Sequence, residues 1–526
     1  MGQATAPASS SEVLHARWLL GAYAAALSAA FLIVLPLAWV GRELATFRNW
    51  QIGIHAVFAL VLLVRPGIRR ALSAAVPPRW AFPVLASGAL TSFLLGSLSL
   101  YFAFDLSGVD FSIFDWMLWS TAHGRFMYTP IYDVNHFGTH PSYVMLPLVP
   151  LHQLFESPFL LLLVGPLVLW AAIFPLRALA RALLMSEAYA LLATAAYLGC
   201  VWIDRLRTGG FRIEVFFPVF GLLFALGWVR REQRFWIAGL VGLLATKEDA
   251  PLYLGALAVA GLVLERNRWR EEVAVLVSSV LILGLDVGIV QPWCRGPGPT
   301  HDAAFERFWG QYGDSLGSIA THMLARPWQP IGAVLTSGWW KFFGPLLFLP
   351  LLGRLPLAAM MPGLLMLGAS GYASMRRFDT YHAIALLPFL LWALFEAWSR
   401  LRPRVRDPMF LAALLVFPIC FGDHFRVLPP RWESFVAEAR IRQELAGLEG
   451  PLSVQTILFP HVPYRRDTMP LFDASPPAGN AALVAPQLSP YPGTSAQWEQ
   501  LVAKARAEHR IDDLGGGIFL LGPERR

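Results

Sequence analysis

Residues 158–176 read PFLLLLVGPLVLWAAIFPL, an apolar run without a charged side chain. A helix needs about 20 mostly apolar residues to cross roughly 30 Å of hydrocarbon, so this run is long enough to span a membrane. Similar runs lie at residues 18–40, 49–64, 81–104, 187–203, 213–229, 271–292, 355–373 and 380–398. Shorter runs lie at residues 235–246, 250–264, 341–353 and 408–421. Together they predict an all-α polytopic transmembrane bundle of about 13 spans.

The composition agrees with a multi-pass membrane protein. Of the 526 residues, 56% are hydrophobic and 15% are charged, whereas a soluble globular protein carries about 25% charged residues. The 3 cysteines are too few for a secreted disulfide scaffold. The net charge of +7 could indicate a nucleic-acid partner, but membrane proteins concentrate arginine in their cytoplasmic loops. We therefore predict no nucleic-acid partner.

The placement of arginine predicts the orientation of the chain. Short loops that are dense in arginine lie at residues 65–79, 177–181, 230–234, 266–270 and 400–406. By the positive-inside rule these loops are cytoplasmic. The long segments 105–157 and 293–340 then lie outside, together with the last hundred residues. We expect an inner (plasma) membrane protein with a cytoplasmic N-terminus and an extracytoplasmic C-terminus.

The composition changes near residue 430, after which no apolar run is long enough to span a membrane. The remaining pattern predicts helices near 431–448 and 495–509 and strands at 453–458, 482–485 and 518–521. Alternation of helices and strands predicts a small α/β domain. We therefore expect three units: residues 1–80 with a polar tail and two additional spans, the transmembrane module 81–429, and the extracytoplasmic α/β domain 430–526.

Acids and histidines are concentrated in the first long outer loop, at Asp105, Asp110, Asp115, His123, Asp133, His136 and His140. The apolar and aromatic residues around Asp110 favour a helix in the membrane interface, with its carboxylates facing an outer cavity. Such carboxylates could act as a general base or hold a divalent metal ion. Alternatively, they form the solvated face of the helix or complement its dipole.

A second group of charges, Lys247, Glu248 and Asp249, lies between two apolar segments that are too short to span comfortably. Charges at membrane depth are costly unless they are paired or face a cavity, which marks them as a candidate functional site. The alternative is an ordinary hairpin tip in water.

A third group is scattered over the expected outer loops and one span: Asp204, Arg205, Arg207, Arg212, Glu214, Asp286, Arg376, Arg377, Asp379, Tyr381 and His382. Its arginines depart from the positive-inside rule. Arginine binds phosphate or carboxylate with two parallel hydrogen bonds, so an outer cavity with arginine could bind an anionic lipid headgroup. Alternatively, these arginines bind no ligand, because outer loops tolerate some arginine.

Several blocks of sequence resemble, in the right order, a family of predicted prokaryotic membrane proteins known as a domain of unknown function. The blocks are VDFSIFDWMLW (109–119), SYVMLPLVPLH (142–152), KED (247–249), FERFWGQYGDSLG (305–317), TYHAIALLP (380–388) and ILFPHVPYR (457–465). The resemblance covers roughly residues 95–526, so the first two spans look like an addition. The chain departs from the family pattern at GGFRIEVFFP (209–218), where Arg212 and Ile213 precede Glu214.

That family is similar in topology to the GT-C glycosyltransferases, which use polyprenyl-phosphate sugar donors and have an acidic residue in the first outer loop. Carried over to this chain, Asp110 matches the acid of the FDxGxF motif, His140 the loop histidine and residues 247–249 the KED motif. The resemblance implies sugar transfer from a polyprenyl-phosphate donor to an unknown acceptor at the extracytoplasmic face. A lipid or solute transporter or flippase, or a non-catalytic assembly protein, remains the alternative.

For sugar transfer, the sequence predicts Asp110 as the general base, with Asp105 and Asp115 as lesser candidates and His140 nearby. Phosphate leaves readily only when its charge is met, and Lys247, Arg212 and Arg377 are the candidate cations. The full set of expected substrate-binding residues is Lys247, Glu248, Asp249, Arg212, Glu214, Arg377, Tyr381 and His382. No cofactor is certain, and a divalent metal ion is a further candidate.

Overall fold

The computed structural model describes residues 8–37, 47–295, 308–420, 432–491 and 493–523. Within this part of the chain, seven helical segments are long and apolar enough to cross a membrane: Ser10–Val34, Phe47–Val64, Ala81–Phe102, Phe159–Leu184, Ile213–Arg230, Trp269–Arg295 and Tyr381–Arg400. Shorter apolar helices are Tyr143–Phe155, Gln233–Leu244, Ala250–Leu264 and Leu355–Ala369. The predicted polytopic helical bundle is confirmed. The predicted number of spans is not exact, because the runs at 187–203 and 341–353 break into shorter helices.

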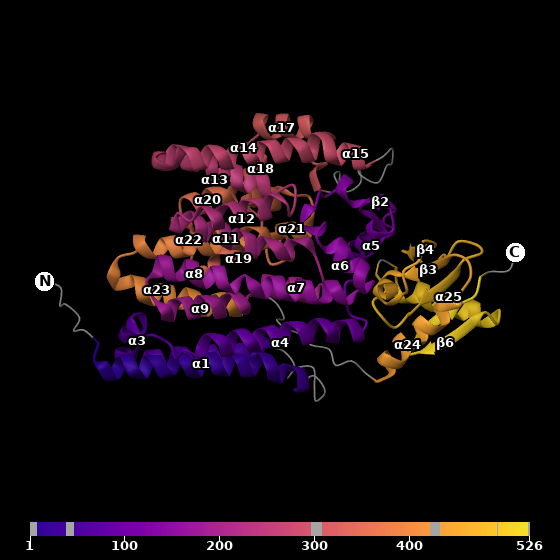
Figure 1. The fold of residues 1–526 in the computed structure, drawn as a ribbon, viewed down its shortest axis with the longest axis horizontal. Coiled ribbons are helices and arrows are strands. Elements are labelled where there is room, and N and C mark those ends of the chain that lie inside the picture. The colour runs from indigo at the N-terminus through magenta and orange to yellow at the C-terminus, as the bar shows by residue number, and fades with distance from the viewer. Residues whose placement is uncertain (1–7, 38–46, 296–307, 421–431, 492, 524–526) are drawn as a thin grey trace.

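The helices of the bundle run roughly along the long axis of the molecule (Figure 1). The main ones are α1 (Ser10–Leu37), α2 (Phe47–Val64), α4 (Ala81–Phe102), α7 (Phe159–Ala171), α8 (Ile173–Leu184), α9 (Glu187–Leu198), α11 (Phe216–Arg230), α12 (Gln233–Leu244), α13 (Ala250–Leu264), α14 (Trp269–Leu285), α20 (Leu355–Ala369), α22 (Leu387–Arg400) and α23 (Pro403–Val416). The span that contains α22 is 83% buried and the span that contains α14 only 17%. Because both are apolar, α22 forms the protein core and α14 presents its apolar side chains outward, as a lipid-facing helix does.

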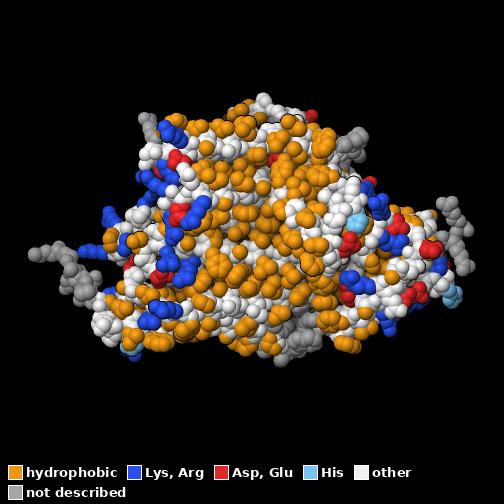
Figure 2. All heavy atoms as spheres, in the orientation of Figure 1, with side chains coloured by type: hydrophobic (Ala, Val, Ile, Leu, Met, Phe, Trp, Pro, Cys, Tyr) orange, Lys and Arg blue, Asp and Glu red, His pale blue; other side chains and the backbone are white. Residues whose placement is uncertain are grey.

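Charged side chains gather at the two ends of the molecule and leave an apolar band between them (Figure 2). Lys and Arg predominate at the end where α3 (Pro66–Ala71) and the α22–α23 connection lie, whereas the other end also carries many acids and holds the C-terminal sheet (Figures 1 and 2). This separation accords with a multi-pass membrane protein. The assignment of the arginine-rich end to the cytoplasm stays a prediction.

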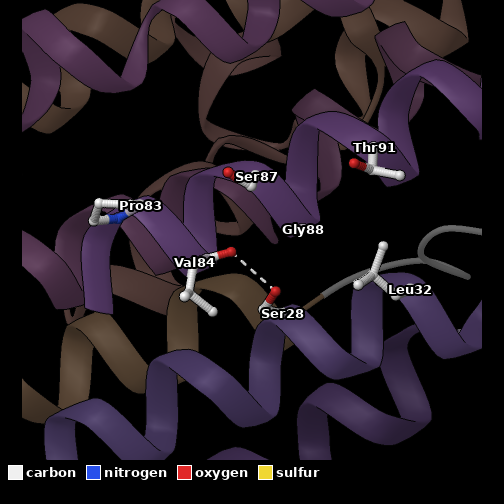
Figure 3. Close-up of a pocket in the computed structure, with 7 residues that line it drawn as sticks. All are labelled: Ser28, Leu32, Pro83, Val84, Ser87, Gly88 and Thr91. Carbon is white, nitrogen blue, oxygen red and sulfur yellow. Dashed lines mark hydrogen bonds between the residues drawn. The ribbon is translucent and has the colours of Figure 1, made fainter. Parts of the chain in front are cut away.

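The N-terminal helix α1 packs closely on α4. A Cβ at Gly88 would lie 2.1 Å from Ser28 Oγ, so only glycine permits this approach. Ser28 Oγ donates a hydrogen bond to the carbonyl oxygen of Val84 at 2.9 Å (Figure 3). A cavity of about 320 Å³ lies beside this contact and is lined by Ser28, Leu32, Pro83, Val84, Ser87, Gly88 and Thr91. None of these lining residues is charged, so this cavity is not the expected charged one.

The C-terminal region forms the predicted small domain, a five-stranded mixed sheet with two helices. Its elements are α24 (Trp432–Ala446), β3 (Leu452–Gln455), β4 (Thr468–Leu471), β5 (Ala481–Val484), α25 (Ser495–Ala507), β6 (Ile511–Gly515) and β7 (Ile518–Leu521). The strand order is β4-β3-β5-β7-β6. Strand β3 is parallel to β4 and β5, whereas β7 is antiparallel to β5 and β6.

Two strands of this sheet were not predicted, and one was predicted too long. β4 has the sequence TMPL and β6 the sequence IDDLG. Proline, aspartate and glycine are depleted in strands, so both edge strands lack the usual signal. The strand expected at 453–458 ends at Gln455, where the chain enters the 3₁₀ turn η11 (Thr456–His461).

The sheet domain shares a hydrophobic core with the first long loop. That loop contains helix α5 (Gly108–Ala122), whose Trp116 and Trp119 are buried with Val454 and Phe459 of the sheet domain. Asp115 is 1% exposed on the same side of α5. The prediction of a helix around Asp110 is therefore confirmed, but this face of it lies against protein and does not open into a cavity.

A buried polar triad crosses the contact between α5 and the sheet domain. Tyr464 Oη donates to the carboxylate of Asp115, 2.9 Å from each oxygen. His152, on α6 (Leu148–Phe155), places Nε2 at 3.1 Å from Tyr464 Oη and at 3.4 Å from Asp115 Oδ1. A buried carboxylate is tolerated only when it is hydrogen-bonded, so this triad fixes how the sheet domain docks.

Replacing Tyr464 with phenylalanine is expected to loosen the sheet domain. The variant removes a donor from a buried carboxylate, which costs about 1–3 kcal/mol in unfolding free energy. Hydrogen exchange of residues 432–523 in the detergent-solubilised protein measures the effect. Tyr491→Phe is the matched control, because that side chain is 67% exposed. Equal exchange in both variants would contradict a docking role for Tyr464.

Candidate active site

Charged side chains from four separate segments converge at the end of the bundle that carries the sheet domain. Asp110 lies in the first turn of α5. Glu214 lies in the 3₁₀ turn η4 (Ile213–Val215), which leads into α11, and Arg212 directly precedes that turn. Lys247 lies in the turn between α12 and α13, and Tyr381 begins the 3₁₀ turn η9 (Tyr381–Leu386) that leads into α22. The structure thus brings together residues that the sequence separates widely.

Asp110 is held by Arg212. Arg212 Nη2 donates to Asp110 Oδ2, and Ser107 Oγ donates to the same oxygen at 2.7 Å. The guanidinium carbon of Arg212 also lies 3.6 Å from the ring centre of Tyr381, a cation–π contact. Arg212 is 12% exposed and Asp110 33% exposed. No described residue hydrogen-bonds Asp110 Oδ1, so one oxygen of a well-oriented carboxylate is open to a ligand.

Two glycines explain how the chain places this pair. At Gly108, a Cβ would lie 2.0 Å from the carbonyl oxygen of Thr456, so α5 begins in direct contact with the sheet domain. Gly210 has φ +86°, a left-handed conformation that glycine adopts without strain. This turn ends α10 (Val201–Thr208) and directs the following Arg212 toward Asp110.

Glu214 and Lys247 form a second ion pair in the cluster. Lys247 Nζ lies 3.0 Å from Glu214 Oε1, and the two side chains are 17% and 12% exposed. Burial opposes the charged form of Lys247, but the carboxylates of Glu214, Asp249 and Glu248 outweigh it and raise the pKa of Lys247. The ammonium group therefore stays charged.

The acids that follow Lys247 are only partly satisfied. Glu248 Oε1 lies 2.7 Å from His140 Nδ1, and Tyr253 Oη donates to Asp249 Oδ2 at 2.7 Å. Glu248 Oε2, Asp249 Oδ1 and the neighbouring His136 Nε2 are buried without a hydrogen-bond partner among the described residues. Buried polar atoms normally have partners, so these atoms are free to bind a polar ligand.

Burial and neighbouring charges shift the pKa values of these groups in different directions. Burial lowers the pKa of His136 to about 3, so its imidazole is neutral. Burial and the adjacent Glu248 raise the pKa of Asp249, despite the opposing effect of Lys247. Burial alone would raise the pKa of Glu248, but the contact with His140 reverses the direction and lowers it. Neighbouring carboxylates with opposite shifts are typical of functional sites.

Most of the predicted substrate-binding residues meet in this cluster, and His382 joins it by packing on Tyr381 with ring centres 4.0 Å apart. Others lie outside it. Asp115 belongs to the triad with Tyr464, and Asp105 is exposed just after α4. Arg377 binds Asp379, with Nε–Oδ1 at 3.1 Å.

The arginine and acid predicted near 204–207 form a structural pair. Arg207 Nη2 lies 3.0 Å from Asp204 Oδ1, with both side chains buried in α10. A Cβ at Gly96 of α4 would lie 2.4 Å from Arg207 Nη1, so this arginine packs tightly between helices. It contributes to the bundle and not to the charged cluster.

Sequence reasoning missed Ser107, Tyr253 and Tyr143, which hydrogen-bond acids that it had singled out. Ser107 and Tyr253 carry the hydrogen bonds of Asp110 and Asp249, and their spacings of three and four residues on a helix were the available signal. Tyr143 Oη donates to Asp286 Oδ1 at 2.6 Å. Asp286 is fully buried in a π-helical turn, Asp286–Val290, that interrupts a lipid-facing span. Such turns are frequent at functional sites.

A preformed metal centre is not found in the described residues, because no three His, Cys, Asp or Glu side chains there are arranged to hold an ion.

Comparisons with known proteins give a family and a set of similar solved structures. The structure is similar to the crystal structure of ArnT from Cupriavidus metallidurans bound to undecaprenyl phosphate, at 13% sequence identity and a TM-score of 0.45, over 85% of this chain and 100% of that one. No curated protein sequence matches the chain.

The family match covers the transmembrane module. The family model DUF2079, described as a predicted membrane protein, matches residues 100–426, more than half of the chain. The match begins at residue 100, so it leaves out the first two spans, as the sequence resemblance predicts, and also most of the third, Ala81–Phe102. It ends before the sheet domain, which that resemblance included. The chain belongs to the DUF2079 family of predicted membrane proteins.

Proposed function

We propose that this protein transfers a sugar from a polyprenyl-phosphate donor to an acceptor hydroxyl at the extracytoplasmic face of the membrane. One observation carries the proposal. Asp110 presents a free carboxylate oxygen beside Arg212, in a cluster with Lys247, at the end of an apolar bundle. A carboxylate beside cations suits a reaction in which a hydroxyl loses its proton and a phosphate leaves.

Asp110 acts as the general base. Its Oδ1 takes the proton of the acceptor hydroxyl as that oxygen attacks the anomeric carbon of the donor sugar. The new carbon–oxygen bond forms while the bond from the anomeric carbon to the phosphate oxygen breaks. The lipid phosphate leaves with the bonding electron pair, and the proton remains on Asp110. Attack from the side opposite the phosphate inverts the anomeric configuration.

Arg212 links the transfer of the proton to Asp110 with the departure of the phosphate. While Asp110 is ionised, it neutralises the guanidinium that binds its Oδ2. When Asp110 takes the proton, Arg212 loses its anionic partner at the moment when the phosphate gains charge. Arg212 and the permanently charged Lys247 then stabilise the departing phosphate. Tyr381 keeps the Arg212 guanidinium in place through the cation–π contact.

The unpartnered polar atoms bind the sugar. Glu248 Oε2 and Asp249 Oδ1 are acceptors without donors, and sugar hydroxyls are donors. A site that hydrogen-bonds hydroxyl groups rejects analogues that lack them, because its buried polar atoms would stay unpaired. His140 holds Glu248 in position through its Nδ1.

Donor turnover by the purified full-length protein tests the proposal. Polyprenyl-phosphate sugar in nanodiscs, together with a cell-envelope extract as the source of acceptor, should yield free polyprenyl phosphate, detected by mass spectrometry. A flippase would move the intact donor across a vesicle bilayer without breaking it. Transbilayer movement with no donor cleavage would therefore contradict the proposal and favour transport.

A further inference from the structure

A second cationic feature lies outside the charged cluster. A cavity of about 310 Å³ is formed where α19 (Trp339–Phe343) and the turn that follows α18 (Trp328–Leu335) meet α21 (Ala373–Arg376). Its lining residues are Thr336, Ser337, Gly338, Trp340, Lys341, Ala373, Arg376 and Arg377. Three of them are basic and none is acidic.

Glycine at position 338 makes this arrangement possible. Gly338 donates its backbone N–H to the carbonyl oxygen of Arg376 at 2.7 Å. A Cβ at this position would lie 2.4 Å from the carbonyl oxygen of Arg377, so any other residue would push the two segments apart. The backbone contact therefore holds Lys341 and the two arginines around one cavity.

The cavity carries more positive than negative charge. Lys341 Nζ lies 2.9 Å from Asp379 Oδ2, and Arg377 Nε lies 3.1 Å from Asp379 Oδ1. The carboxylate of Asp379 thus pairs with both Lys341 and Arg377. Arg376 reaches only the hydroxyl of Thr336, at 3.4 Å, and its buried Nε has no hydrogen-bond partner among the described residues. In the charged cluster, by contrast, Arg212 and Lys247 each have their own carboxylate.

The surroundings of the cavity are apolar and aromatic. Trp340, which lines the cavity, is 50% exposed, and Leu335, next to the lining residue Thr336, is 65% exposed. Exposed tryptophan is enriched where a membrane protein crosses the interface between lipid and water. A ligand that reaches this cavity from the membrane would therefore place an anionic headgroup among the arginines and its chains along the apolar surface.

We infer that this cavity binds the phosphate group of a membrane lipid. Arginine pairs recognise phosphate oxygens through several hydrogen bonds, and the unused Nε of Arg376 supplies one of them. The lipid is either an anionic phospholipid or a polyprenyl phosphate, which share this chemistry. Arg377 lies four residues before Tyr381 of the charged cluster in the sequence. The inference does not depend on sugar transfer.

Lipid titration of the full-length protein, followed by native mass spectrometry, tests this site. The probes are phosphatidylglycerol, undecaprenyl phosphate and an uncharged galactosyl diacylglycerol. The wild-type protein should retain at least one phosphate lipid about tenfold more tightly than the uncharged lipid, a factor that corresponds to about 1.4 kcal/mol. Preference for phosphatidylglycerol identifies a phospholipid site, and preference for undecaprenyl phosphate identifies a site for the donor type of lipid.

The variant Arg376→Gln/Arg377→Gln should lose this preference, and Arg376→Lys/Arg377→Lys should keep part of it. Arg440→Gln/Arg506→Gln removes the same charge from exposed positions of the sheet domain and should bind as the wild type does. Ala373→Glu keeps both arginines but adds a carboxylate to the cavity, and it should weaken binding in a protein that still folds. Wild-type binding of both phosphate lipids by Ala373→Glu and by the glutamine variant would overturn the inference.

Discussion

The Asp110→Asn variant is expected to lose sugar transfer by about 10²–10⁴-fold while it still inserts and folds, because this is the usual contribution of a general base. Asparagine has nearly the same shape and keeps an oxygen that accepts the hydrogen bond of Arg212. It cannot take up the proton of the acceptor hydroxyl. Release of polyprenyl phosphate from the donor, measured under single-turnover conditions, isolates this step from product release.

A matched substitution controls this experiment. Asp105→Asn removes a carboxylate from the same loop at an exposed position just after α4. We expect transfer by this variant to remain near the wild-type rate. Full activity of Asp110→Asn would remove Asp110 as the base, and loss of activity in Asp105→Asn alone would transfer the role to Asp105.

Replacing Lys247 with methionine is expected to destabilise the bundle and to weaken donor binding. The substitution leaves Glu214 in a buried site without its ammonium partner, at 3.0 Å in the wild type. Breaking a buried ion pair on one side costs about 3–5 kcal/mol. Thermal unfolding in detergent measures the first effect, and binding of a polyprenyl-phosphate sugar to protein in nanodiscs measures the second.

The double variant Lys247→Met/Glu214→Gln separates the two effects. It removes both charges, so the stability should recover toward that of the wild type. Donor binding should stay weak, because the cation that meets the phosphate is still missing. Recovery of donor binding in the double variant would show that Lys247 serves only the fold.

The helices and the charged residues of the site could be predicted from the sequence, but the contacts between those residues could not. An apolar run such as residues 158–176 predicts a helix because lipid selects for apolar side chains at every position. Charges such as Lys247 stood out because apolar segments flank them. Their pairing was not predictable, since the bond between Arg212 and Asp110 joins positions 102 residues apart. No local pattern records such a distant contact.

Asp115 shows the same limit, because the sequence did not reveal that its role is structural. Its place in the same acidic loop made it a lesser candidate base beside Asp110. The structure separates the two, because one turn of α5 directs Asp110 to Arg212 and the next directs Asp115 to Tyr464. The difference depends on the sheet domain, whose docking the sequence of α5 alone does not reveal.

The contact between α5 and the sheet domain also has a consequence for biosynthesis. Asp115 and Tyr464 are 349 residues apart in the chain. At about 5–20 residues per second, a ribosome needs roughly 20–70 s to make the intervening segment. During that interval Trp116 and Trp119 of α5 are not yet packed against the sheet domain. A copy that terminates after the last span but before the sheet domain would keep its spans, yet Trp116 and Trp119 would never be covered.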